Sequence, residues 1–383
     1  MQLTPRHLLM QFGHVAQQDL FPHVVTAVGP LNADLELLVS VLALLPLERL
    51  LSSRRARTGR PPKDRAALAT AFLAKAILNL PTTRDLLDRL RVDTALRRLC
   101  GWPDARRVPH ESKFSRTFAE FAATELPQQL HQAVIEATQH DRLVGHIARD
   151  STAIEARERF PAPPVKHKKQ SKRRRKGAFS RAKAAERGTR MQRQRHQKLE
   201  RMLAELPKGC DLGAKTNSQG HKQYWRGYKL HLDVADGQIP ISAVLTSASV
   251  HDSQVAIPLM TMTSERVEHL YELMDSAYDA EAIHAHSRQL NHVPIIAPHP
   301  RRGTKKPSKL PKIFPVELAP ELTWAEQARY RERTMSERVN ARLKDEFGAN
   351  HLRVRGPGKV MAHLMFGVLA LTVDQWLRLA IPT

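Results

Sequence analysis

Apolar residues recur at helical spacing through the N-terminal third of the chain. A dense apolar run covers residues 35–45, and apolar side chains return every three or four positions over residues 67–78. This period is typical of helices that bury one face. Two further periodic segments follow residues that can cap the start of a helix: Thr82 or Thr83 before the first, and Ser112 before the second. The pattern predicts an all-α domain over residues 1–135.

The last of these short helices carries Lys113 and Arg116 in its first turns. Three short helices, of which the last begins with polar and basic residues, resemble a helix-turn-helix. In that motif the N-terminal residues of the final helix contact the major groove of DNA. A plain helical bundle with solvated cations gives the same pattern. Lys113 and Arg116 are therefore candidate DNA-binding residues, with the bundle as the open alternative.

In the second half of the chain, segments with the two-residue period of strands alternate with helical segments. The order β-β-β-α-β-α-β-α predicts a mixed five-stranded sheet with flanking helices. The first three strands would be antiparallel, and the later two would join beside the first through helical crossovers. The predicted strands cover residues 146–154, 224–236, 238–249, 269–275 and 293–298.

These elements predict an α/β domain over residues 140–375 and a helical tail at residues 345–383. A basic arm at residues 160–215 interrupts the α/β domain. Between residues 166 and 201 there are sixteen Lys or Arg against two acids, so the local excess is 16 − 2 = 14. Such a segment cannot bury a core. We expect a mobile arm that follows phosphates, with a solvated linker as the alternative; its candidate DNA-binding residues are Lys172, Arg173, Arg174 and Arg175.

The whole chain of 383 residues has a formal charge of +23 and a pI near 10.5. Such a charge favours a polyanionic partner, because Lys and Arg release the counterions condensed on nucleic acid. The most apolar stretch, residues 364–373, is too short to span a bilayer, and the N-terminus lacks the layout of a secretory signal. We therefore expect a cytoplasmic DNA-binding protein without a membrane partner. Cys100 and Cys210 are the only cysteines, which excludes a disulfide framework and a Cys-rich zinc site.

Four residues near the end of the chain have a distinctive spacing: Tyr330, Arg333, Glu337 and Lys344. On one α-helix they fall within about 60° of arc, so a single face would present all four. One carboxylate would then lie among three groups suited to phosphate or nucleobase contact. The ordinary alternative is that Glu337 forms a surface ion pair with Arg333 or Arg338.

Two aspartates occupy the strands that the predicted order makes neighbours. Asp150 lies in the first strand, and Asp275 ends the fourth. If these strands adjoin, the aspartates meet, and Glu337 on the last helix can complete a cluster of three carboxylates. Three carboxylates repel one another unless a cation neutralises them, and Mg²⁺ prefers such oxygen ligands. Asp150 as an ordinary strand-end residue and Asp275 as the cap of the turn at Ser276 are the alternatives.

These residues match a known family. The chain resembles bacterial insertion-sequence transposases of the DDE type, in the group with the signature Y-(2)-R-(3)-E-(6)-K, which Tyr330, Arg333, Glu337 and Lys344 satisfy without a gap. The segments RDSTAI and MDSAYDA, which hold Asp150 and Asp275, resemble the first two catalytic strands of that family. The likeness covers roughly residues 55–375.

The resemblance implies a ribonuclease-H-like catalytic domain in which Asp150, Asp275 and Glu337 bind two Mg²⁺ ions, with Mn²⁺ as a substitute. It implies that water hydrolyses a phosphodiester at the transposon end and that the freed 3′-hydroxyl attacks target DNA. Tyr330, Arg333 and Lys344 would hold the terminal phosphates. The expected partners are the terminal inverted repeats, the target DNA, and further copies of the chain in a homodimer or higher oligomer at the bacterial nucleoid.

The chain departs from some members of the family. About 60 residues separate Asp275 from Glu337, which leaves no room for the β-rich insertion that those members carry there. Two other functions stay open from the sequence. One is a DNA-binding regulator that has lost catalysis, and the other is a metal-dependent endonuclease that does not join DNA.

His251 and Asp252 follow the third predicted strand and fall near the same site. We expect Asp252 to cap a helix, with contact to the metal or support of a metal ligand as the less favoured alternative. Four further histidines lack a convincing ligand arrangement, and we interpret them as surface or loop residues: His284, His286, His292 and His299.

Overall fold

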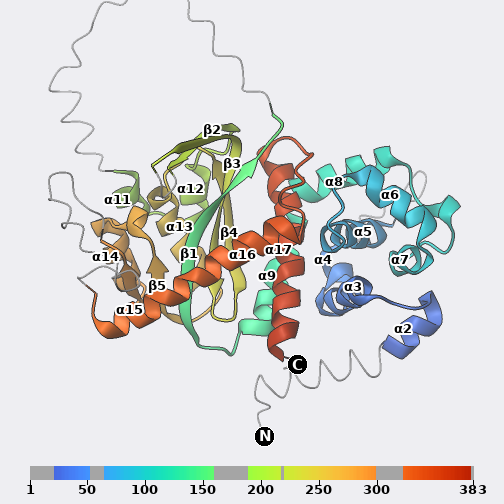
Figure 1. The fold of residues 1–383 in the computed structure, drawn as a ribbon, viewed down its shortest axis with the longest axis horizontal. Coiled ribbons are helices and arrows are strands. Elements are labelled where there is room, and N and C mark those ends of the chain that lie inside the picture. Colours follow the sequence, from blue (N-terminus) through green and yellow to red (C-terminus); the bar gives the residue numbers. More distant parts are fainter. Residues whose placement is uncertain (1–20, 52–63, 159–188, 217–219, 299–321, 381–383) are drawn as a thin grey trace, which may run out of the picture.

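The structure is a computed structural model, and it describes residues 21–51, 64–158, 189–216, 220–298 and 322–380. The candidate DNA-binding residues Lys172, Arg173, Arg174 and Arg175 lie outside the described residues, as does His299. Figure 1 shows the helices of the N-terminal region beside a twisted sheet, with the long helix α17 between them.

The N-terminal region is helical, as predicted. Thr82 caps α6 in a capping box with Asp85, as its position before the apolar period suggested. Ser112 does not cap α8, because that helix begins one residue earlier and the ring of His110 accepts the backbone hydrogen bond instead. The helices are α2 (Phe21–Val28), α3 (Ala33–Leu44), α4 (Leu47–Leu50), α5 (Arg65–Ile77), α6 (Thr83–Val92), α7 (Thr94–Leu99), α8 (Glu111–Ala123) and α9 (Leu126–Gln139), with the short 3₁₀ helix η2 (Ala105–Arg107) before α8.

Within the residues that the structure describes, the sheet has six strands, one more than predicted. Its order is β2-β3-β1-β5-β6, with β4 also paired to β3. β1, β3 and β4 are antiparallel neighbours, while β5 lies parallel to β1 and β6 parallel to β5. This confirms the predicted topology. The strands are β1 (Val144–Glu155), β2 (Asp211–Thr216), β3 (Lys222–Ala235), β4 (Ile239–Ser247), β5 (His269–Met274) and β6 (Val293–Ile296).

The additional strand lies at the end of the segment predicted as a basic arm. β2 pairs antiparallel with the first half of β3, from Asp211 opposite Gly227 to Thr216 opposite Lys222. Its sequence, DLGAKT, has too few apolar residues to give a strand signal. The pairing with β3 therefore decides its conformation.

Helices cover both faces of the sheet, and the two-residue period of the strands separates them. On β4, Val244 packs with α13 residues, whereas Ala243 and Leu245 join the core cluster that includes α17. α13 (Ser253–Ser264) thus covers one face, and α16 (Thr334–Asp345) and α17 (Pro357–Ala380) cover the opposite one. α11 (Arg190–Gln194), α12 (Leu199–Ala204) and α14 (Glu281–Gln289) extend the layer of α13.

The C-terminal tail forms the central core helix. α17 packs against α9, β4 and the N-terminal helices α3, α5 and α8, so one hydrophobic cluster runs from Leu38 through Phe72 to Leu232. At 24 residues α17 is longer than the apolar stretch that the sequence marked, and by length and composition alone it could cross a membrane. Within the fold, 78% of its most apolar window is buried, as in a core helix.

We predict that Gly367→Ala destabilises the protein by about 1–3 kcal/mol, because it overpacks the crossing of α16 and α17. A Cβ atom at Gly367 would lie 2.5 Å from the backbone oxygen of Phe347 and 3.1 Å from a methyl carbon of Leu343. Denaturant unfolding measures the change. Gly358→Ala is the matched control on the same helix, since its nearest neighbour would be 4.0 Å away. Equal stability of both variants would contradict the packing.

Acid should destabilise the fold through a histidine buried where α9, α17 and β4 meet. Burial, aided by Arg266, lowers the pKa of His131 to about 3, and its ring nitrogen donates to the Pro240 oxygen at 3.0 Å. The unfolded chain therefore binds this proton first, and stability falls as the pH drops below about 6.5. His131→Asn should reduce the slope of the unfolding free energy between pH 6.5 and 5 by up to about one proton. The exposed His196→Asn is the control, and an unchanged slope in His131→Asn would contradict the assignment.

Candidate functional site

Asp150 lies on β1, and Asp275 directly follows the neighbouring parallel strand β5. Ala148 on β1 is in register with Leu273 on β5, and Asp150 and Asp275 each follow two residues later. Because side chains alternate across a strand, both carboxyls face the side of the sheet that α16 covers. The sequence placed these strands side by side, and the structure confirms that placement.

Asp150 is mostly withdrawn from solvent. Its Oδ2 accepts a hydrogen bond from the Asn340 amide of α16 at 3.2 Å. Burial and, to a lesser extent, the charge of Asp275 raise the pKa of Asp150, while a backbone hydrogen bond, Arg333 and Lys215 lower it, and the net result is a pKa of about 6. A carboxyl in this setting gains from a nearby cation, because the ionised form is otherwise penalised.

Asp275 also has a structural role. Its Oδ1 accepts the backbone N–H of Ala277 at 2.9 Å and caps the 3₁₀ helix η3 (Ser276–Tyr278). The alternative that the sequence left open is thus present in the structure. The cap fixes the side chain at the strand end without neutralising it, and burial raises the pKa of Asp275 as well.

The segment that carries Tyr330, Arg333, Glu337 and Lys344 is not one unbroken α-helix. α15 (Trp324–Tyr330) passes through a 3₁₀ turn, η4 (Arg331–Arg333), before α16 begins. Three residues at about 120° instead of 100° shift Tyr330 by about 60°, which still leaves the four residues within about 40° of arc. The Tyr330 ring is buried against Leu273 and Ile295.

Arg333 currently occupies the place between the acids. Its Nη2 lies 2.8 Å from Glu337 Oε1, its guanidinium carbon lies 5.7 Å from the centre of the Tyr330 ring, and it lowers the pKa of both Asp150 and Asp275. The Glu337 side chain is 53% exposed. The ion pair with Arg333 was the ordinary alternative for Glu337, and the structure contains it.

Two lysines complete the charged surroundings. Lys344 is half-buried on α16, and burial together with Lys215 lowers its pKa, while Glu155 and Asp150 raise it. Lys215 comes from β2 and acts electrostatically on both aspartates. The sequence did not single out Lys215, because it fell within the predicted arm; only the pairing of β2 with β3 brings it to the site.

Asp252 does not cap its helix, so the favoured sequence interpretation is wrong. It stands at the N-cap position of α13 without a capping hydrogen bond; the preceding His251 accepts the N–H of Ser253 instead. The Asp252 carboxylate accepts from Lys229 Nζ at 2.9 Å and from Ser151 Oγ at 3.0 Å. Its charge raises the pKa of Asp275, so it belongs to the surroundings of the site.

A buried ion network lies directly behind the two aspartates. Arg149, the neighbour of Asp150, is 1% exposed and faces the α13 side. Its Nη2 lies 2.6 Å from Asp233 on β3 and 3.3 Å from Glu272 on β5. Burial alone would raise the pKa of Glu272, but Arg149 and His269 lower it to about 2. This network ties the three central strands together at the level of the site.

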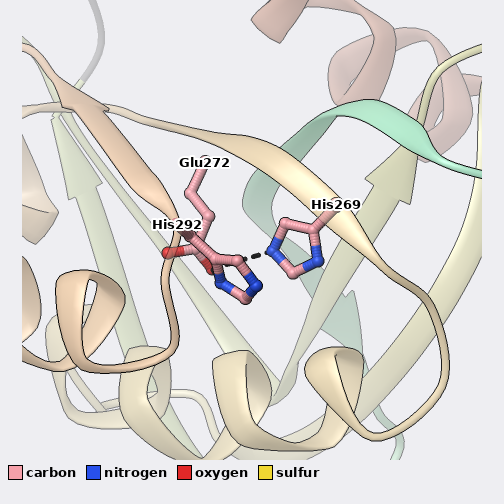
Figure 2. Close-up of side chains that lie close together, drawn as sticks. All are labelled: His269, Glu272 and His292. Carbon is pink, nitrogen blue, oxygen red and sulfur yellow. Dashed lines mark ion pairs between the residues drawn. The ribbon is translucent and has the colours of Figure 1, made fainter.

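Two histidines that the sequence placed on the surface are buried in the same layer. His286 hydrogen-bonds Thr261 at 3.0 Å, and His292 stacks on His269 beside Glu272 (Figure 2). The interpretation as a surface or loop residue is therefore wrong for His286, which is buried on α14, whereas His292 does lie in the loop before β6 but is buried there. His284 is half-buried beside Asp279.

The cluster His269, Glu272 and His292 has the composition of a metal site, but its rings are not arranged as ligands. The ring centres are 3.6 Å apart, while two imidazoles on one zinc ion lie about 5 Å apart. The Glu272 oxygen that faces the rings is already paired with Arg149. We interpret the cluster as polar core packing.

The N-terminal candidates lie on α8, apart from the acids. Arg116 is exposed and donates to the Ser112 oxygen at 3.2 Å, whereas Lys113 is half-buried. The short helices α6, α7 and α8 follow one another closely, as a helix-turn-helix requires. Their contact with DNA stays a prediction.

Comparison with known protein families identifies two matches along the chain. The family model described as the transposase DDE domain matches residues 145–373, and the one described as a transposase domain (DUF772) matches residues 25–120. No curated protein and no solved structure matches the chain. The first match covers the sheet with all three candidate acids.

The first of these families implies dependence on a divalent metal. The chain offers fitting residues: Asp150 and Asp275 face the same side of the sheet, and the pKa of each is raised by burial. Glu337 lies on α16, which covers the same face, and its carboxylate pairs with Arg333. These oxygen donors suit a hard divalent ion.

We predict that a divalent metal raises the melting temperature of the wild-type protein by a few degrees, because an ion at 100 times its Kd adds about 2.7 kcal/mol to stability. Asp150→Asn and Asp275→Asn should abolish the shift, which differential scanning fluorimetry with Mg²⁺ or Mn²⁺ measures. Asp141→Asn, an exposed carboxylate elsewhere, should keep it. If the shift survives Asp150→Asn but disappears in His292→Asn, the ion binds at His269, Glu272 and His292 instead, and the predicted site is contradicted.

Proposed function

Because the chain belongs to the transposase DDE domain family, we propose that it is a transposase that binds the terminal inverted repeats of an insertion sequence and catalyses cleavage and strand transfer. The observation that carries this proposal is the register of β1 and β5, which brings Asp150 and Asp275 to one edge and one face of the sheet. Glu337 on the crossing helix supplies the third acid.

In this proposal Asp150, Asp275 and Glu337 hold Mg²⁺, with Mn²⁺ as a substitute. Bound there, the metal would supply an activated oxygen nucleophile and stabilise the leaving oxygen of a phosphodiester. Mg²⁺ is favoured because the site offers carboxylates rather than sulfur or imidazole, and because this ion keeps positions open for water and phosphate.

The cations around the acids bind the DNA. Arg333 leaves Glu337 when DNA arrives and takes a phosphate oxygen, since its planar fork matches phosphate as well as carboxylate. Lys344 and Lys215 contact phosphates further along the strand. Burial lowers the pKa of Lys344, and a phosphate beside it would raise that pKa again by favouring the charged form.

Tyr330 positions Arg333. Its ring packs on Leu273 and Ile295, on the strands next to the site, and the guanidinium lies against it. Tyr330 is buried, so we assign it this positioning role in place of the contact with the terminal phosphates that the family resemblance implied.

Two alternatives use the same residues. A regulator without catalysis would need neither the three acids nor their raised pKa values. Because the chain has kept the acids, and burial raises the pKa of Asp150 and Asp275, this alternative is disfavoured. An endonuclease without joining activity shares the triad, and a joining assay separates it. We further propose that the protein acts in the bacterial cytoplasm at the nucleoid, as a homodimer or higher oligomer on DNA.

We expect Glu337→Gln to lower cleavage of a transposon end by at least about a hundredfold, because loss of a metal ligand removes several kcal/mol of transition-state stabilisation. The assay uses purified protein, Mg²⁺ and a labelled duplex of the element's own end. Glu332→Gln is the matched control, since Glu332 is exposed on the adjacent 3₁₀ turn. DNA binding of both variants should stay near the wild-type level.

Wild-type cleavage by Glu337→Gln would refute the triad. A duplex with a pre-cut 3′-hydroxyl end and a target plasmid tests the second step. A joined product supports the transposase, whereas cleavage without any joined product favours the endonuclease.

A further inference from the structure

A groove lies between the N-terminal helices and the segment that joins α16 to α17. It encloses about 800 Å³. α6 and α8 form one wall, with Arg84 and Ser115, and the segment after α16 forms the other, with Arg353 and Arg355. The two walls come from parts of the chain that lie 271 residues apart in sequence, counted from Arg84 to Arg355.

The charge of the groove is strongly positive. Arg353, Arg355 and Lys359 are exposed along the second wall, and none of them has a carboxylate partner within the part of the chain that the structure describes. The acids of the opposite wall are already engaged: Asp85 completes the capping box of α6, and Glu111 pairs with Arg84 at 3.5 Å. Unpaired cations that line one concave surface favour an extended anion.

A cation is also held inside the groove. Lys75 is buried and donates to the Leu80 carbonyl at 2.7 Å, and it lines the same space. Burial lowers the pKa of Lys75 to about 8, although Asp85 raises it. An anion in the groove would stabilise the charged ammonium.

The floor of the groove argues against a stacked base. Phe72, Phe118 and Phe366 pack on one another with ring centres 4.8 to 6.3 Å apart. All three are buried, so no aromatic face is free for a nucleobase. A groove with cationic walls and a closed apolar floor fits the sugar-phosphate backbone of duplex DNA, because phosphate contacts need charge and no base-reading groups.

α16 links this groove to the candidate acids. Its first turns carry Glu337, and its last residue, Asp345, accepts a hydrogen bond from Asn79 of the N-terminal region at 2.7 Å. Eight residues of helix span about 12 Å. Figure 1 shows α16 crossing the sheet toward α17 and the N-terminal helices, so Lys344 lies on the way from the acids to the groove.

We propose that this groove is a second DNA site, which holds the backbone of the duplex end while the acids act on the terminal phosphodiester. It rests on the proposed function. At 3.4 Å per base pair, the roughly 12 Å along α16 correspond to about four base pairs, so the groove would meet phosphates beginning about four base pairs from the cleaved bond. Arg353, Arg355 and Lys359 make the contacts.

The experiment uses the double variant Arg353→Ala/Arg355→Ala in the full chain. The control is Lys208→Ala/Arg288→Ala, which removes two exposed cations that do not line the groove. Binding to a duplex end is measured over a range of salt concentrations. The groove variant should bind at least about tenfold more weakly at low salt, with the slope of log K against log salt reduced by about two, since each lost phosphate contact removes about one unit.

Phosphate ethylation interference locates the contact. Ethyl groups beginning about four base pairs from the cut should weaken binding of the wild type and have no effect on the groove variant. If wild-type protein binds the end but the groove variant keeps the same slope and the same interference pattern, the groove assignment is wrong. If wild-type protein binds its transposon end no better than unrelated DNA and does not cut it, the proposed function itself is contradicted, independently of the groove.

Discussion

The buried pairing of Arg149 with Asp233 and Glu272 is the interaction on which the candidate site depends. One guanidinium joins β1, β3 and β5 on the face of the sheet opposite the acids. A register slip of one residue would move Asp150 to the wrong face and leave Arg149 unpaired in the core. Removing one partner of such a buried network costs about 3–5 kcal/mol. The network therefore favours the single register in which Asp150 and Asp275 adjoin.

The second constraint is the packing of α16 and α17. Arg342 on α16 pairs with Asp374 on α17 at 2.7 Å, and Gly367 lets the two helices approach closely. α17 in turn packs on the N-terminal helices and on β4. The helix that carries Glu337 is thus fixed relative to both the sheet and the proposed groove. A DNA end that contacts both walls would be held in one orientation, which is what positioning for an in-line reaction requires.

Much of this arrangement could be predicted from the sequence, since it depends on local patterns. The alternation of strand and helix periods gave the pairing of β1 with β5, and the order of Asp150, Asp275 and Glu337 along those elements gave the candidate acids. The sequence did not predict β2, because DLGAKT is polar and becomes a strand only by pairing with β3. Lys215 was missed because it lies on that strand.

The side-chain contacts of two other residues could not be predicted either. Asp252 was misassigned because its contacts with Lys229 and Ser151 come from distant strands, and no spacing rule reveals them. The burial of His292 against His269 is likewise a tertiary effect.

The most direct test of the central claim is Fe²⁺-directed cleavage of the protein itself. Fe²⁺ replaces the native divalent ion and, with ascorbate and peroxide, cuts the backbone beside its ligands. The account predicts cuts next to Asp150, Asp275 and Glu337 that excess Mg²⁺ suppresses. Cuts near His292 without cuts near Asp150 and Glu337 would contradict it, because the ion would then lie in the buried histidine cluster on the other face of the sheet.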